Sequence, residues 1–424
     1  MKKLIVTLAA LMCLITNTSL AEDFSVNSRQ AIAVEMTTGK ILYAKEAQQK
    51  APIASLTKLL TVYLVLKEIK AGRLQWDSQV TLSEYALQLA ADPDISNPAF
   101  EQRPYTIKEL VESSLIISAN SSAVALAEHI AGSEPTFVDM MKKQLEAWGI
   151  RDYRLVNASG LNNSMLKGHL YPGSQPDDEN QMTARDLALI AQQLLQDFPE
   201  VLTISSQAQL KWGEKDLPNS NLLLAGREMA RTGVDGLKTG TTSQAGQTMI
   251  ATAVQDNMRV ISVILHADQS DTDERARFVE TNRLLDYCFN SYTLEKLVAQ
   301  NQVLPERLIV KQAAKQRLRV KANQSLMVVR PKDQTQLSYS LRIKDKVLKT
   351  PIRQNKKVGT LIYQDPKLID SGYLAAPPAV AIVSAKAFLK KGNLANYLTF
   401  FKKSLAFSLT LNIFKKYISF VLLK

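Results

Sequence analysis

A serine and a lysine three residues apart, Ser55 and Lys58 in the run Ser55-Leu56-Thr57-Lys58, could carry out covalent chemistry. Near the start of a helix, residues at this spacing share one face, so the lysine amine can take the proton of the serine hydroxyl. The amine must be neutral to do so, which burial and nearby positive charge favour. Because S-x-x-K is expected about once or twice by chance in a chain of this length, the pair alone is a weak signal.

Two further motifs follow in order along the chain. Ser118-Ala119-Asn120 lies between two predicted helices, where its hydroxyl can relay a proton to a leaving amine and its amide can orient a substrate carbonyl. Lys238-Thr239-Gly240 lies on a predicted strand, where the amine and the hydroxyl suit a carboxylate. Its glycine leaves the strand edge open to an added strand of substrate. Taken alone, each motif also fits an ordinary capped loop or a polar turn at a strand end.

Apolar periodicity predicts the elements that must position these motifs. Two short apolar runs around a glycine-containing turn, at 31–36 and 41–44, predict a hairpin. Helices are expected over 56–69, 107–115, 123–130, 136–148 and 184–195, and strands over 236–242, 249–254 and 259–265. Strands at both ends with helices between them favour an α+β fold whose first and last parts share one sheet. The polar stretch 157–181 predicts a long loop, a kind of segment that is usually functional.

The two ends of the chain differ from the body. Lys2 and Lys3, the apolar run 4–15 and the small residues at 19–21 predict an export signal cleaved after Ala21. From about residue 297, short strand-like runs recur at intervals of about 8–12 residues, which is typical of a small β-sandwich. We therefore expect a signal peptide over 1–21, an α+β domain over 22–292, a small β-rich domain over 293–378 and a basic amphipathic anchor over 379–424.

The net charge of +12 is concentrated near the ends. The signal holds two lysines, and residues 371–424 hold eight lysines and no acidic residue, which leaves +2 for residues 22–370. A nucleic-acid reader carries its basic face on a folded domain, so no nucleic-acid partner is expected. Lysine pairs divide the tail into apolar runs too short to span a bilayer, which favours a helix lying on an anionic membrane surface. A transmembrane hairpin and an unfolded basic tail are the alternatives.

The three motifs together resemble those of the penicillin-interacting serine acyl-enzymes, S-x-x-K, S-D-N and K-T-G, with S-A-N in second place here. ASLTK at 54–58, SANSSAVALAEHIAG at 118–132 and VDGLKTGTTSQAG at 234–246 are similar to the secreted D-alanyl-D-alanine carboxypeptidases, which are low-molecular-mass penicillin-binding proteins. The resemblance covers about residues 24–290, and the β-rich module and basic C-terminus also fit this family. It implies a penicillin-binding/β-lactamase-like fold, an exported enzyme held at the outer face of the cytoplasmic membrane, and no metal or organic cofactor. The implied substrate is a peptidoglycan stem peptide ending in D-Ala-D-Ala, with β-lactams as inhibitors.

The resemblance also implies a role for each matching residue. Ser55 would be the acylated nucleophile and Lys58 its base, with Ser118 and Asn120 forming the opposite wall of the site. Lys238 would hold the terminal carboxylate of the peptide.

The strand of the third motif would supply the remaining contacts. Thr239 would bind the carboxylate beside Lys238, Gly240 would leave room for the peptide, and the backbone N–H groups of Ser55 and Thr241 would form the oxyanion hole. The family also uses an arginine beyond this strand. Arg277 is our choice, and Arg275 is the alternative.

The chain departs from the family pattern at one further stretch, and two other functions are left open as interpretations. Some relatives carry a histidine where this chain has 157–161, Asn-Ala-Ser-Gly-Leu, and a hydroxyl cannot replace that histidine as a base for deacylation. A class A-type β-lactamase would need a glutamate to activate water; Glu179 lies in a suitable loop, but the residues after it do not resemble that enzyme's motif. A non-catalytic wall-binding protein on the same fold is the third possibility, although Ser55, Lys58 and Lys238 are all present.

Overall fold

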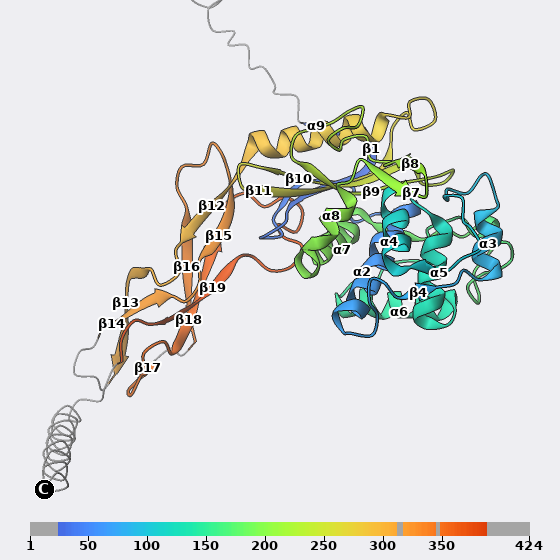
Figure 1. Cartoon of the computed structure of the whole chain (residues 1–424). Helices are drawn as coiled ribbons and strands as arrows, with labels where there is room; N and C mark the ends of the chain where they lie inside the picture. The colour runs from blue at the N-terminus through green and yellow to red at the C-terminus, as the bar shows by residue number, and fades with distance from the viewer. Residues whose placement is uncertain (1–23, 312–316, 345–347, 388–424) are drawn as a thin grey trace, which may run out of the picture.

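The computed structural model describes residues 24–311, 317–344 and 348–387 (Figure 1). At its centre is an antiparallel five-stranded sheet in the order β2-β1-β11-β10-β9. Its strands are β1 (Ser28–Glu35), β2 (Ile41–Lys45), β9 (Val234–Thr242), β10 (Gly246–Gln255) and β11 (Met258–Ala267). The prediction that the first and last parts of the α+β region share one sheet is confirmed.

Alternating side chains of this sheet enter two different cores, as the two-residue period of a strand requires. On β1, Ile32 and Val34 face the core built by the helices of the first 200 residues. Ala31 and Ala33 face the opposite core, which includes Leu284 of the long helix α9 (Ala276–Ser291). In Figure 1 the sheet accordingly lies between α9 on one face and α7 and α8 on the other.

The five predicted helices are present with shifted ends. They are α2 (Lys58–Lys70), α4 (Ile107–Ile116), α5 (Asn120–Ala131), α6 (Glu134–Ala147) and α7 (Ala184–Asp197). Local signals set the ends: Thr106 and Glu109 form a capping box at the start of α4, and Gly132 closes α5 with φ of 78°. The sequence did not predict α3 (Glu84–Ala90), α8 (Leu202–Ser205) or α9.

Short elements complete the α+β region. They are the 3-10 turns η1 (Ala54–Thr57), η2 (Asn163–Met165) and η3 (Pro199–Val201), and the strand pairs β3 (Lys50–Pro52) with β6 (Gln181–Thr183), β4 (Gln79–Val80) with β5 (Tyr105–Thr106), and β7 (Gln209–Trp212) with β8 (Lys215–Pro218). Between η2 and β6 the chain forms the long loop that the polar stretch 157–181 predicts.

Beyond α9 the described chain is built of strands. One sheet pairs β12 (Tyr292–Val298) with β15 (Leu326–Pro331), and a six-stranded sheet has the order β16-β18-β19-β14-β13-β17. Its strands are β13 (Val303–Lys311), β14 (Arg317–Ala322), β16 (Ser338–Ile343), β17 (Leu348–Lys349), β18 (Lys357–Gln364) and β19 (Ala379–Ser384). They enclose a core of their own, with Leu318 and Val320 of β14 buried between exposed arginines. The expected β-rich region is present.

The structure corrects the predicted start of the anchor at residue 379. Ala379–Ser384 form β19, which is hydrogen-bonded between β18 and β14 in the six-stranded sheet. The apolar run of these six residues, with Val380 and Ile382 buried, belongs to the β core and not to a surface helix. The signal peptide and residues 388–424 of the anchor lie outside the described residues, so both stay predictions. Within the part of the chain that the structure describes, no helix is both long and apolar enough to cross a bilayer.

Between β18 and β19 the chain runs back to the central sheet. We call residues 365–374 the return segment. Its Gly372 carbonyl accepts the Ile41 N–H at 3.0 Å, and its Leu374 N–H donates to the Gly39 carbonyl at 2.9 Å, beside the turn between β1 and β2. Lys40 at this turn is fully buried and forms an ion pair with Asp365. Arg185 of α7 donates to the carbonyls of residues 373 and 374, at 3.0 and 2.7 Å.

Candidate active site

Ser55 and Lys58 lie where η1 passes into α2. Ala54, directly before the serine, has φ of 47°, a conformation that non-glycine residues seldom adopt. The bend is accommodated because Gly160 passes the Ala54 carbonyl so closely that a Cβ there would lie 1.9 Å from its oxygen. Directly after this bend, Ser55 Oγ lies 2.8 Å from Lys58 Nζ.

Lys58 is fully buried and has three oxygen neighbours. Besides Ser55 Oγ, these are Asn120 Oδ1 at 2.8 Å and the Ser159 carbonyl at 2.7 Å. A neutral amine has two N–H groups for the amide and carbonyl oxygens and one lone pair for the serine O–H, so the neutral form fits these partners. Burial, with a further contribution from Lys238, holds the pKa of Lys58 well below that of an ordinary lysine.

The second motif occupies the junction between α4 and α5. Ser118 has φ of 65° and lines the same cleft as Ser55. Asn120 is the first residue of α5 and is anchored by the Ser96 carbonyl, which accepts its backbone N–H at 3.0 Å and its side-chain amide at 3.1 Å. The amide oxygen of Asn120 is thereby left to face Lys58.

The third motif lies on β9, the edge strand of the five-stranded sheet, beside η1. A Cβ on Gly240 would lie 3.0 Å from the Ser55 nitrogen and 2.7 Å from Thr248 Oγ1, so only glycine lets this strand approach the nucleophile so closely. Thr239 Oγ1 donates to Ser220 Oγ at 2.7 Å at the cleft wall. Burial, together with the charge of Arg277, lowers the pKa of the buried Lys238 to about 7.

The structure separates the two candidate arginines. Arg277, the second residue of α9, is buried and donates to the Gly240 carbonyl at 2.7 Å and to Thr241 Oγ1 at 2.6 Å. Burial lowers its pKa to about 10. Arg275 instead forms a surface ion pair with Glu228 and does not line the cleft. Arg277 is thus the arginine that the fold brings to the third motif.

One cleft of about 480 Å³ is lined by six of the predicted site residues: Ser55, Ser118, Thr239, Gly240, Thr241 and Arg277. The buried Lys58, Asn120 and Lys238 do not line it, and Lys238 Nζ donates to the Thr239 carbonyl at 2.9 Å. The cleft also has lining residues that the sequence did not single out: Ser96, Ile117, Ser220, Leu222, Gln247, Ser270, Glu274 and Phe278. Gln247 is of particular interest because it links Arg277 to the neighbouring loop. Its Oε1 accepts from the Arg277 Nε at 3.2 Å, and its amide donates to the carbonyls of residues 270 and 273. Its position two residues after the turn that follows Lys238-Thr239-Gly240 was the only signal in the sequence, and it was a faint one.

The two stretches that raised alternatives have clear places in the fold. Ser159 is buried and supplies its carbonyl to Lys58, while its hydroxyl lies 3.3 Å from Asn157 Oδ1. Glu179 is fully buried, accepting from Thr242 Oγ1 at 2.7 Å and from the Asn162 amide at 3.2 Å. Glu179 does not line the cleft and ties the long loop to the end of β9.

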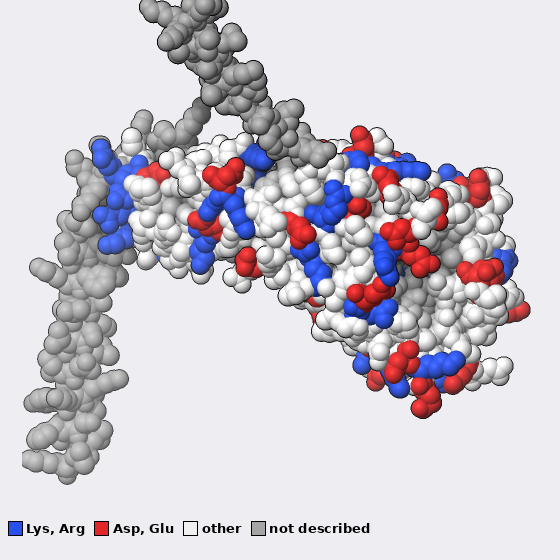
Figure 2. All heavy atoms as spheres, turned by 90° about the horizontal axis from the view of Figure 1, so that it is seen from above, with Lys and Arg blue, Asp and Glu red and all other residues white. Residues whose placement is uncertain are grey.

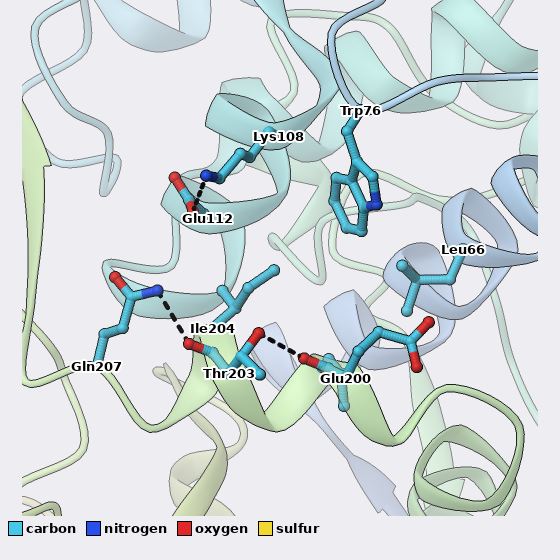
Figure 3. A pocket seen from close by; sticks show the side chains of 9 residues that line it. Leu66, Trp76, Lys108, Glu112, Glu200, Thr203, Ile204 and Gln207 are labelled. Atoms are coloured by element: carbon cyan, nitrogen blue, oxygen red, sulfur yellow. Dashed lines mark hydrogen bonds and ion pairs between the residues drawn. The ribbon is translucent and has the colours of Figure 1, made fainter.

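Two other features of the described structure bear on its chemistry. Among the described residues, no group of three or more His, Cys, Asp or Glu side chains could hold a metal ion. A second hollow of about 430 Å³ lies between α2, α4 and α8, with Trp76 and Leu66 on one side and the Lys108–Glu112 pair on the other (Figure 3). It contains none of the predicted catalytic residues.

The chain is similar to known proteins over most of its length. The family described as D-alanyl-D-alanine carboxypeptidase (peptidase S11) matches residues 16–269. The chain is 27% identical over 390 residues to the D-alanyl-D-alanine carboxypeptidase DacF of Bacillus subtilis, with 90% of each chain covered.

Two solved structures extend the likeness to three dimensions. The peptidoglycan synthesis regulatory factor (PBP3) of Streptococcus pneumoniae is 39% identical, with a TM-score of 0.78, over 86% of this chain and all of that chain. Penicillin-binding protein D2 of Listeria monocytogenes, solved with cefotaxime bound, is 29% identical with a TM-score of 0.54, over 63% of this chain and 99% of that one.

Proposed function

The chain belongs to the D-alanyl-D-alanine carboxypeptidase family of serine peptidases, and from this premise we propose how its residues carry out the reaction. It is a penicillin-binding protein that removes the terminal D-Ala from peptidoglycan stem peptides and is inhibited by β-lactams. The observation that carries the mechanism is the 2.8 Å contact between Ser55 Oγ and the buried amine of Lys58, with Ser55 lining the same cleft as Thr239 and Gly240 of the third motif.

Acylation begins with the peptide along the open edge of β9, its terminal carboxylate held by Lys238, Thr239 and Arg277. Lys58 takes the Ser55 proton while Oγ attacks the carbonyl carbon of the penultimate D-Ala. The oxygen that becomes negative is stabilised by the backbone N–H groups of Ser55 and Thr241, a contribution of about 10²–10³ in rate per donor.

The C–N bond then breaks, and the leaving D-Ala amine receives a proton that Ser118 relays from Lys58. Water hydrolyses the Ser55 ester and releases the shortened peptide. A β-lactam follows the same first step, since its ring amide opens on Ser55 and leaves an ester. The buried position of Glu179 away from the cleft argues against the glutamate-assisted route of a class A-type β-lactamase.

A labelling experiment tests this proposal. The purified protein is incubated with a fluorescent penicillin, the modified peptide is mapped by mass spectrometry, and D-Ala release from a stem pentapeptide is measured. We expect a lasting adduct on the peptide containing Ser55 together with D-Ala release. Rapid penicillin hydrolysis without an adduct would favour the β-lactamase, and neither activity would favour the non-catalytic wall-binding protein.

The two arginines provide a matched pair of variants. Arg277→Ala removes a buried cation beside the predicted carboxylate site, so we expect the KM for the pentapeptide to rise about 10- to 100-fold. Arg275→Ala removes a surface ion pair, and we expect kinetic constants within twofold of the parent protein. Steady-state D-Ala release measures both; equal effects in the two variants would show that Arg277 is not the carboxylate ligand.

We further propose that the exported protein is held at the outer face of the cytoplasmic membrane by its lysine-rich tail. Support comes from the eight lysines without an acidic residue in 371–424. In Figure 2 lysines and arginines gather at the end of the β-rich region farthest from the five-stranded sheet. On β14, at that end, Arg317 and Arg319 are exposed.

A chain that ends at Ala387 tests the membrane proposal while keeping all of the described residues. We expect the full chain without its signal to sediment with vesicles containing phosphatidylglycerol, and the shortened chain to stay in the supernatant. Vesicles of phosphatidylcholine alone and added salt serve as controls, because both weaken electrostatic attraction. Equal sedimentation of the two chains would remove the tail as the anchor.

A further inference from the structure

Glu134 is a buried carboxyl group that the mechanism above does not use. It is the first residue of α6, yet its side chain turns inward and only 5% of the residue is exposed. Ser133 already caps the helix by accepting the Thr136 N–H, so Glu134 is not needed there. No lysine or arginine among the described residues forms an ion pair with it. Burying a carboxyl group without a paired cation costs folding free energy, so a functional role for Glu134 would account for its position.

The contacts of Glu134 lead directly to the catalytic lysine. Its Oε1 accepts the Ala158 N–H at 2.8 Å. The carbonyl of Ala158 accepts Thr61 Oγ1 at 2.7 Å, and the next carbonyl, of Ser159, accepts Lys58 Nζ at 2.7 Å. Because Lys58 and Thr61 lie one turn apart on α2, the backbone segment 158–159 is held by hydrogen bonds between α6 and the helix that carries the base. Glu134 thus fixes the backbone that orients Lys58.

Glu134 also influences Lys58 through its charge. Burial raises the pKa of Glu134 to about 7, and the Ala158 and Tyr85 hydrogen bonds act in the opposite direction. The titratable groups that face Glu134 are Tyr85 from α3, whose hydroxyl donates to Oε2 at 3.2 Å, Glu128 from α5 and Lys58 from α2. At Lys58, the charge of Glu134 raises the pKa while that of Lys238 lowers it. The base therefore lies between one acidic and one basic neighbour.

We propose that Glu134 is a positioning residue for the reaction, which holds the 158–159 backbone against Lys58 and offsets the positive charge of Lys238. The inference rests on the proposed role of Lys58 as the base of acylation. Without Glu134 the amine would be held less firmly, and without its negative charge the amine would be a weaker base.

Glu134→Gln separates charge from geometry. The amide oxygen can still accept the Ala158 N–H and the amide N–H can donate to the Tyr85 oxygen, so the fold is retained while the charge is lost. We expect the acid limb of the acylation rate by fluorescent penicillin to move to lower pH by about half a unit to one unit. The rate on the plateau should fall about threefold to tenfold, because a weaker base removes the serine proton more slowly.

Glu146→Gln is the matched control, since Glu146 lies exposed at the other end of α6. We expect its pH profile to coincide with that of the parent protein. Glu134→Ala also removes the hold on Ala158, and we expect a further loss of about tenfold at all pH values. If that variant unfolds in a thermal melt, the glutamine variant alone decides the question.

An acid limb of Glu134→Gln that coincides with the parent's would overturn the proposal, because a merely structural glutamate leaves the basicity of Lys58 unchanged. A parent protein that forms no adduct and releases no D-Ala would instead contradict the proposed function. The two failures are distinguishable, since one concerns only the variant and the other the unaltered enzyme.

Discussion

Replacing Ser55 with alanine is expected to abolish the penicillin adduct and to slow D-Ala release by at least about 10⁴-fold. The reason is chemical: the ester on Oγ is the only covalent intermediate of the proposed reaction. Among the described residues, no other side-chain hydroxyl is hydrogen-bonded to a fully buried lysine whose pKa burial holds well below that of an ordinary lysine. The cleft and its carboxylate-binding groups stay in place, so the variant should still bind the peptide.

Binding of the pentapeptide to the Ser55→Ala protein can be measured by calorimetry alongside the turnover assay. Ser164→Ala is the matched control, because Ser164 is exposed and lies outside the cleft. We expect it to label and turn over like the parent. Full carboxypeptidase activity in Ser55→Ala would show that the nucleophile has been misassigned.

Lys58→Met should lower the acylation rate by about 10²- to 10⁴-fold, the usual contribution of a general base. The thioether chain fills most of the lysine volume but cannot take the Ser55 proton. Lys67→Ala, on the exposed side of the same helix, is the control and should leave acylation unchanged. Stopped-flow labelling with fluorescent penicillin measures both, and a Lys58→Met rate close to the parent's would exclude Lys58 as the base.

The same substitution carries an expectation for stability against pH. The pKa of Lys58 is lower in the folded protein than in the unfolded chain, so below the ordinary lysine pKa the unfolded state binds more protons. The parent therefore loses stability as pH falls from about 10.5 towards the lowered pKa. Lys58→Met lacks this loss, and urea titrations should show the difference between the two proteins shifting in favour of the variant as pH decreases. A difference that stays constant with pH would contradict a lowered pKa.

Most of the central sheet and its helices could be predicted from apolar periodicity, because their buried faces repeat regularly. Helix α9 could not, since its buried face includes Arg277, Glu280 and Thr281, which break the apolar pattern. The predicted start of the anchor at residue 379 was wrong because there the pattern is too uniformly apolar to be decisive. The run around Val380 is apolar at nearly every position, and a periodic pattern alone does not tell a tail from a central strand.

The residues of the candidate site also fall into those that the sequence could predict and those that it could not. Ser55 and Lys58 could be predicted because their spacing is local, and the three motifs because their order resembles a known family. The Ser159 carbonyl and the carboxyl group of Glu134 could not, because their contacts with α2 and with residue 158 join segments 24 to 101 positions apart. A backbone carbonyl has no residue type to mark it, so only the fold reveals such a partner.

The return segment has a mechanical consequence for the enzyme. The β-rich region is joined to the catalytic region once through the end of α9 and again through the backbone and ion-pair contacts around Lys40. A body fastened at one point can swivel, whereas a body fastened at two resists torsion. The β-rich region is therefore held in a fixed orientation relative to the catalytic region. An attachment of its far end to a surface would then determine both the distance of the active-site cleft from that surface and the direction in which the cleft faces.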